Sequence, residues 1–122
     1  MKRIILFVLS ILLLVANLAF TADTISPEEA INHIGQQATV CGNVTSTHFA
    51  SRSKGQPTFI DLNSPYPNQI FTVFIWGSDR GKFSSAPETY YNSKNICVRG
   101  LIVRYRGTPE IIVRDPSQIS VK

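Results

Sequence analysis

The chain shows its clearest strand pattern in residues 96–113, which have the sequence ICVRGLIVRYRGTPEIIV. Ile96 and Val98 alternate with Cys97 and Arg99, which is the period of a strand that buries one side. After Gly100 the alternation shifts by one residue. A glycine at such a shift predicts a β-bulge, which bends the strand. The apolar set beyond the shift is then Leu101, Val103 and Tyr105.

A turn and a returning strand follow the predicted bulge. Residues 106–109 contain the glycine and proline of a tight turn, and residues 110–113 have the composition of a second strand. The basic residues of the stretch stay on its polar side. The pattern therefore predicts a bent, basic-edged hairpin of the kind that closes a small barrel.

The first 22 residues have the composition of a signal peptide. Lys2 and Arg3 precede an apolar run over residues 4–15 that only Ser10 interrupts, and small residues follow up to residue 22. The cleavage site is poorly defined, and the alternative is an anchor retained over residues 4–20, at the short limit of a membrane span. We expect a periplasmic or secreted protein that meets the membrane only during export.

The rest of the chain, residues 23–122, has the length and apolar content of one domain with its own core. The formal net charge is +4, and it falls to +2 when Lys2 and Arg3 are left out. Residues 51–122 hold ten basic and five acidic residues, whereas residues 23–50 hold three acidic and no basic ones. The total is a weak signal for an anionic partner, and the distribution places that signal in the second half.

Cys41 and Cys97 are the only cysteines of the chain. An even pair in an oxidising compartment predicts a disulfide. Both cysteines lie opposite the apolar phase of their strands, so their sulfur atoms can meet if the strands are neighbours. Two free structural thiols are the alternative. No metal site is expected, because His33 and His48 lie at no ligand-like spacing from a cysteine or from each other.

The remaining pattern predicts one short helix, three more strands and an irregular connector. Ser26, Pro27 and Glu29 form a capping box with proline at the first helical position, so a helix should run to about residue 34. Strand patterns follow at residues 39–47, 58–63 and 71–76, and residues 77–94 are irregular with room for one helical turn. Both alternate sets of residues 71–76 are apolar, so both faces are covered or one is a contact surface.

Five strands with this spacing predict an all-β chain with the five-stranded OB-fold, a Greek-key barrel with a short N-terminal helix. Such barrels bind ligands through the face of their second and third strands and the loops beside it. The first and fourth strands are neighbours in this topology. The fold therefore also predicts that Cys41 lies beside Cys97.

Four segments carry a resemblance to a known family: TVCGNV at residues 39–44, YPNQIFTV at 66–73, CVRG at 97–100 and YRGTPEI at 105–111. They resemble small secreted bacterial OB-fold proteins described as nucleic-acid-binding, which are related to the OB modules of some secreted nucleases. The resemblance extends over residues 26–119. It implies the OB-fold and, more generally, a nucleic-acid ligand.

The candidate site is a groove between two basic loops. Arg52 and Lys54 fall on the loop between the first and second strands, and Arg104 and Arg106 fall at the final hairpin. These cations would neutralise phosphates of single-stranded DNA or RNA. Aromatic faces for base stacking would come from Phe59 and Tyr66.

Two other interpretations stay open at the level of sequence. The cations are ordinary solvated loop charges in the first, where Tyr66 packs on its prolines and Phe59 belongs to a minor core. In the second, the chain is an envelope adaptor that binds a protein or glycan partner through the same groove.

Catalysis is not expected. An OB-fold nuclease needs clustered carboxylates for a metal ion, but the acidic residues after residue 50 have no such spacing. No serine or cysteine has a histidine and an acid partner indicated by sequence. We therefore predict no catalytic residue, no cofactor and no metal. The dispersed carboxylates are Asp61, Asp79, Glu88, Glu110 and Asp115.

Overall fold

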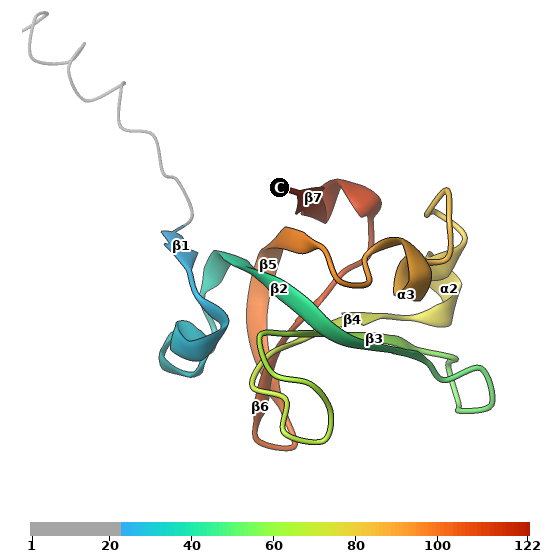
Figure 1. Ribbon diagram of the computed structural model, residues 1–122. Helices are drawn as coiled ribbons and strands as arrows, with labels where there is room; N and C mark the ends of the chain where they lie inside the picture. Colours follow the sequence, from blue (N-terminus) through green and yellow to red (C-terminus); the bar gives the residue numbers. More distant parts are fainter. Residues whose placement is uncertain (1–22) are drawn as a thin grey trace, which may run out of the picture.

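The computed structural model describes residues 23–122 (Figure 1). The predicted signal peptide, residues 1–22, lies outside the described residues. Within residues 23–122, no helix is both long enough and apolar enough to cross a membrane.

The described chain is mostly β-structure, with seven strands and four short helical segments. Five strands match the five predicted ones, and two strands of three residues each, β1 and β7, were not predicted. The strands are β1 (Asp23–Ile25), β2 (Gln37–Phe49), β3 (Thr58–Leu62), β4 (Thr72–Ile75), β5 (Asn95–Tyr105), β6 (Thr108–Ile112) and β7 (Ile119–Val121). The helical segments are η1 (Pro27–His33), α2 (Gly77–Arg80), α3 (Pro87–Tyr90) and η2 (Pro116–Gln118).

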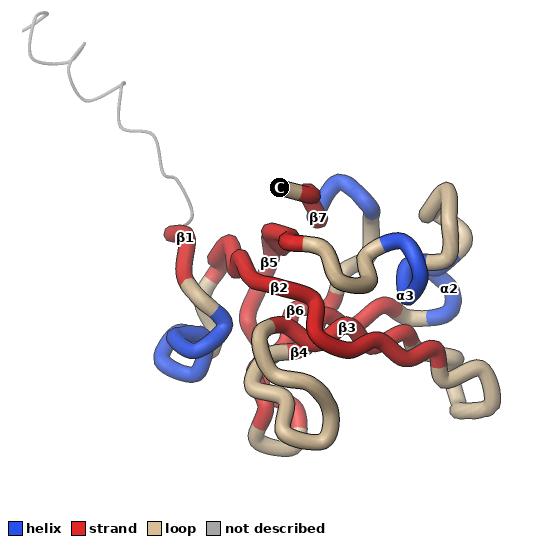
Figure 2. The backbone as a smooth tube through the Cα atoms, viewed as in Figure 1, coloured by secondary structure: helices blue, strands red, loops and turns tan. Residues whose placement is uncertain are grey.

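The five longer strands close into a ring in the order β2-β3-β4-β6-β5, because β2 pairs with both β3 and β5. The pair β4 and β6 is parallel, and the other pairs of the ring are antiparallel. The predicted first and fourth strands, β2 and β5, are thus neighbours. Figure 2 shows the β3–β4 loop and the β5–β6 hairpin in the lower half of the view, away from α3.

The core lies inside this ring and consists mainly of β-branched side chains. Period-two alternation directs every second residue inward, and β-branched residues suit this packing. The fully buried set includes Val40, Ile60, Val73, Ile96, Ile102 and Ile111.

The predicted N-terminal helix is present, as a 3-10 helix. Ser26 Oγ accepts from the Glu29 backbone N–H, and the Glu29 side chain reaches back to Ser26, which completes the capping box. Ala30 is fully buried on the core side. Gly35 follows the helix with φ +85°, a left-handed conformation that glycine adopts without strain.

Cys41 and Cys97 form a disulfide between β2 and β5. The two residues lie directly opposite each other in the strand register, with a Cα–Cα distance of 4.0 Å. The bond joins residues 56 positions apart in the sequence. These residues lie on two strands whose pairing closes the ring.

The predicted bulge at Gly100 is wrong. The register of β2 and β5 runs without a shift from Asn43–Asn95 to Gln37–Leu101. Alternation therefore continues through Gly100, so that Ile102 is fully buried and Leu101 is 45% exposed. The bulge of the barrel lies in β2 instead, between Val44 and Ser46.

Gly100 faces the core and leaves room for a neighbouring side chain. A Cβ atom at this position would lie 2.7 Å from Ile111 Cγ2. Because residues 101 and 102 are both apolar, the local pattern fits either phase. β6 packs so close to position 100 that a side chain would not fit there. This selects the phase in which Gly100, which has no side chain, faces the core.

We predict that Gly100→Ala lowers the free energy of unfolding by about 1–3 kcal/mol, the usual cost of overpacking a core. Denaturant unfolding measures this. The matched control is Gly81→Ala, because a Cβ there meets no atom within 4 Å. That control should stay within about 0.5 kcal/mol of the parent. Equal stabilities of the two variants would contradict the inward placement of Gly100.

Candidate functional site

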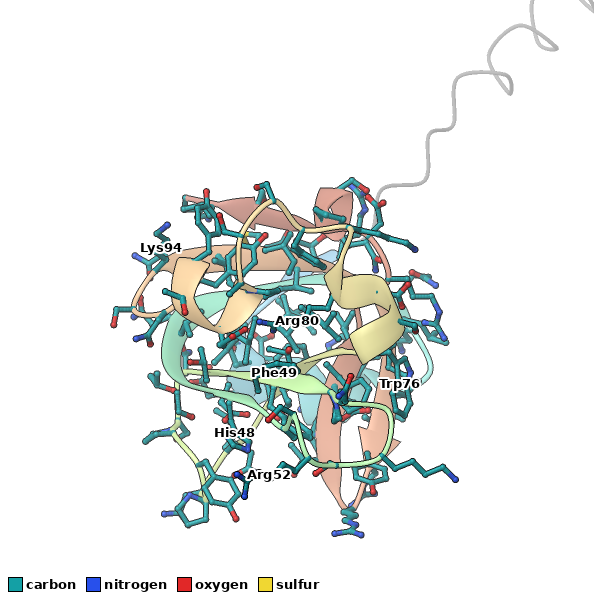
Figure 3. The ribbon with its side chains drawn as sticks, turned by 90° about the vertical axis from the view of Figure 1, so that its right-hand side faces the viewer. His48, Phe49, Arg52, Trp76, Arg80 and Lys94 are labelled. Atoms are coloured by element: carbon teal, nitrogen blue, oxygen red, sulfur yellow. A yellow bond between two sulfur atoms is a disulfide. The ribbon has the colours of Figure 1, made fainter. Side chains whose placement is uncertain are left out.

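The outer face of β2, β3 and β4 carries a row of aromatic side chains, here called the aromatic row: His48, Phe59, Phe74 and Trp76. His48 is paired with Phe59 across β2 and β3, and Phe59 with Phe74 across β3 and β4. Ring centroids lie 6.5 Å apart for His48 and Phe59, 5.5 Å for Phe59 and Phe74, and 4.5 Å for Phe74 and Trp76. Figure 3 shows His48 and Trp76 at opposite ends of this face.

Alternation in β4 explains why the row points outward. Val73 and Ile75 fill the core, so Phe74 and the following Trp76 face outward. Sequence analysis predicted that the second apolar face of residues 71–76 is either covered or a contact surface. The structure shows that it is partly both. Phe74 is buried between neighbouring rings, and Trp76 is 40% exposed.

The loop between β2 and β3 is anchored on one end of the row. The Gly77 N–H donates to the Gly55 carbonyl oxygen at 2.9 Å. Gly55 has φ +77°, and a Cβ atom there would lie 2.8 Å from the Trp76 ring. The glycine therefore lets this loop pack flat on Trp76. The loop carries the exposed residues Arg52 and Lys54.

A pocket of about 640 Å³ opens beside the row, between this loop and the segment that joins β3 to β4. Two of the predicted site residues meet here, Phe59 from β3 and Tyr66 from the joining segment. Tyr66 is 74% exposed, so its ring is available to a ligand. The polar lining includes Ser46, Asp61, Gln69 and Thr72.

A hydrogen-bond chain crosses the pocket floor through Asp61. Thr72 Oγ1 donates to Asp61 Oδ1 at 2.8 Å, and Ser46 Oγ donates to Asp61 Oδ2 at 2.7 Å. Ser46 Oγ in turn accepts from the Tyr66 backbone N–H at 3.0 Å. The three side chains are cross-strand neighbours on β2, β3 and β4. This series of hydrogen bonds, here called the Asp61 chain, thus ties the backbone of Tyr66 to the barrel.

The four predicted cations occupy two different loops and do not all meet. Ser53, which lies between Arg52 and Lys54 in sequence, lines the pocket. Arg104 and Arg106 are exposed at the β5–β6 hairpin, whose turn lines a second hollow with η1. Gln69 contributes to both hollows, so the segment joining β3 to β4 lies between the two basic loops.

Charge pairing separates these four cations from two others. Within residues 23–122, ion pairs join Arg80 to Glu88 and Lys82 to Asp79, and none involves the four predicted cations. Arg80 also donates to Thr58 Oγ1 at 3.0 Å and lies 3.7 Å from the centroid of the Phe49 ring (Figure 3). This arginine is a structural residue under α3, and its hydrogen bonds hold the pKa of Glu88 below its usual range.

Glu110 is a further carboxyl group on the outer face, and sequence analysis gave it no role. It lies beside Thr72 in the register of β4 and β6 and is buried. Burial raises the pKa of Glu110. The described residues contain no group of three or more His, Cys, Asp or Glu side chains placed to hold a metal ion.

Sequence reasoning missed His48, the outward role of Phe74, and the Asp61 chain. His48 could have been found from the sequence, because this residue follows Ser46 at period two once the strand is extended beyond residue 47. Asp61 appeared only as one dispersed carboxylate. Its function depends on cross-strand register, which is not visible in a single strand.

Comparison with known proteins gives matches among solved structures. No protein-family model matches the chain, and no curated protein matches it. An OBody, AM1L10, bound to hen egg-white lysozyme matches with a TM-score of 0.53 at 17% identity, over 86% of this chain and 98% of that one. The aspartyl-tRNA synthetase of Entamoeba histolytica matches with a TM-score of 0.52 at 16% identity, over 82% of this chain.

A protein assigned as an aspartyl-tRNA synthetase from Leishmania major Friedlin matches with a TM-score of 0.50 at 11% identity, over 86% of this chain. The chain spans 21% of the length of each synthetase. Together with the strand order, the matches support one statement. The chain has an OB-like barrel fold. The OB-fold part of the predicted resemblance is thus supported, and its secreted and nuclease-related part stays a prediction.

The raised pKa of Glu110 predicts a gain in stability for Glu110→Gln. A carboxyl whose pKa is higher in the folded protein loses stability as pH rises from its unfolded pKa through its folded pKa. Glu110→Gln should therefore unfold at a higher temperature than the parent at about pH 7, with the gain vanishing below about pH 4. Thermal unfolding at both values measures this.

The control for this prediction has the opposite sign. Arg80 lowers the pKa of Glu88, so Glu88 stabilises the protein above its unfolded pKa and that stability is lost in acid. Glu88→Gln should therefore lower the unfolding temperature at neutral pH. A loss of stability in both variants would contradict the cost assigned to the Glu110 carboxylate.

Proposed function

We propose that this chain is an exported, non-catalytic OB-fold protein that binds single-stranded nucleic acid, either DNA or RNA. The binding surface is the outer face of β2, β3 and β4, in the groove between the β2–β3 loop and the β5–β6 hairpin. The observation that carries the proposal is the aromatic row with Tyr66 beside it, the basic β2–β3 loop packed on Trp76, and the basic β5–β6 hairpin beyond the segment that joins β3 to β4.

The chemistry of a single strand fits this arrangement. Bases stack on exposed aromatic faces, a contact worth about 1–3 kcal/mol per base and tolerant of sequence. Tyr66 and the exposed edge of the row supply such faces. Phosphates need cations at the margins, and these are Arg52 and Lys54 on one side and Arg104 and Arg106 on the other.

The comparisons are compatible with nucleic-acid binding and with a second function. Two of the matched proteins are named as aspartyl-tRNA synthetases, which supports an RNA ligand for this topology. The OBody bound to lysozyme places it equally in a protein that binds protein. The exposed Trp76 and Tyr66 would also serve a protein partner. The second candidate is therefore an adaptor module of the cell envelope that uses the same groove.

Two further parts of the proposal rest on local chemistry. The disulfide is compatible with an oxidising compartment outside the cytoplasm, in agreement with the predicted signal peptide. The contacts of three carboxylates support the proposal that the protein is non-catalytic. Asp79 and Glu88 pair with cations, and Asp61 accepts hydrogen bonds from two hydroxyl groups.

Salt dependence tests the nucleic-acid proposal. Each neutralised phosphate adds to the slope of log affinity against log salt, so the combined change Arg104→Ala and Arg106→Asn should flatten the slope by about 1–2 units. Asparagine is chosen for residue 106 because its φ is +49°, which asparagine tolerates. Fluorescence anisotropy with labelled single-stranded DNA and RNA measures the slope.

Two variants complete this test. Arg99→Ala is the matched control, because Arg99 is exposed on β5 opposite Thr39 of β2 and away from β3 and β4, and its slope should equal that of the parent. Tyr66→Ala should weaken binding by about 1–3 kcal/mol with little change in slope. Absence of salt-sensitive binding to DNA and RNA at about 50 mM salt would remove the nucleic-acid proposal and favour the adaptor.

A further inference from the structure

We propose that the pocket beside the aromatic row selects a base that carries an amino group, with guanine preferred over adenine and cytosine, and uracil and thymine bound least well. Asp61 is the specificity-determining residue. This inference rests on the proposed function, because it assigns a base to one position of the same binding face.

The direction of the hydrogen bonds on the pocket floor carries the inference. The hydroxyl protons of Ser46 and Thr72 are both donated to Asp61, and the Tyr66 N–H is donated to Ser46. These donors are therefore already used. Toward a ligand, Asp61 and Thr72 therefore present the free lone pairs of the carboxylate and of Thr72 Oγ1.

Gln69 adds a further acceptor to the same pocket. Its Oε1 atom is buried and receives no hydrogen bond from the described residues. A buried acceptor without a partner carries an uncompensated desolvation cost, and a turn of the Gln69 side chain toward a donating base would remove it. Gln69 lies on the segment that joins β3 to β4, so it approaches the pocket from the opposite side to the β2–β3 loop.

A floor of acceptors suits some bases and not others. The Watson–Crick edge of guanine has two adjacent donors, N1–H and the N2 amino group. Adenine and cytosine each offer one amino group beside a ring nitrogen acceptor. Uracil and thymine offer a single N–H between two carbonyl oxygens, which a carboxylate repels. The predicted order of affinity follows from these patterns.

The position of Asp61 also argues against a phosphate in this pocket. A carboxylate at the centre of an anion-binding face weakens phosphate binding, whereas it strengthens a hydrogen bond to a base edge. The cations of the face lie on loops at its margins, and Asp61 lies on β3 next to the stacking ring of Phe59. Phosphates thus fit the margins, and a base edge fits the pocket.

The test compares oligonucleotides that differ at one base. Thymine oligonucleotides of about eight residues, within the span of one OB-fold, carry guanine, inosine, adenine or cytosine at one central position. Inosine keeps the two-ring stacking surface and the N1–H donor of guanine and lacks only its amino group, so it isolates the contribution of that amino group. We expect guanine to bind about 10-fold more tightly than thymine, on the scale of a well-formed bidentate base contact. Inosine should lose most of this gain.

Two carboxylate variants assign the selectivity to the pocket. Asp61→Asn replaces an acceptor oxygen with a donating amino group, so guanine should lose its advantage over inosine. Asp79→Asn removes a carboxylate of α2 that pairs with Lys82 outside the binding face, and it should keep the advantage. Gln69→Leu, at a partly exposed loop position, should reduce the advantage of guanine over inosine. This variant decides the test if Asp61→Asn does not fold.

Each outcome separates this inference from the proposed function. If none of the oligonucleotides binds, both fall together. Equal affinity of the parent for thymine, inosine and guanine oligonucleotides would leave the proposed function standing and overturn the inference. Binding of an arginine-rich peptide that depends on Asp61, with no oligonucleotide binding, would assign the pocket to a protein partner and overturn both.

Discussion

The pairing of β2 with β5 is the constraint on which the rest of the barrel depends. It joins segments more than fifty residues apart along the chain, and the Cys41–Cys97 disulfide lies in the middle of it. Once these strands are paired, the sheet is closed, and alternate residues of every strand must point into or out of the ring. Closure therefore buries the β-branched core and, by the same alternation, turns the aromatic row outward.

The bulge in β2 then determines what the outer face contains. Residues 37–43 of β2 pair with β5, and residues 44–49 pair with β3, so the strand passes from one side of the barrel to the other at the bulge. The extra residue sets the phase of the second half. Ser46 and His48 consequently lie outside, beside Asp61 and Phe59. Without this change of phase, the Asp61 chain would lose one of its two donors.

Period two, capping residues and turn chemistry made the ring strands, the N-terminal helix and the cysteine pair predictable from sequence. The phase beyond Gly100 was not, because Leu101 and Ile102 are both apolar and only the packing of Ile111 decides between them. The strands β1 and β7 are too short to show a period. The structural role of Arg80 was equally hidden, since its partners Thr58 and Glu88 lie on different elements.

The central claim is that the outer face of β2, β3 and β4 binds a single strand, and nuclear magnetic resonance mapping tests it most directly. Backbone amide shifts are followed while a short single-stranded oligonucleotide is added at low salt. The account predicts that the largest shifts fall on His48, Phe59, Tyr66 and Phe74 and follow one binding curve. Shifts confined to β1, β7 and η2, with β3 and β4 unchanged, would contradict it.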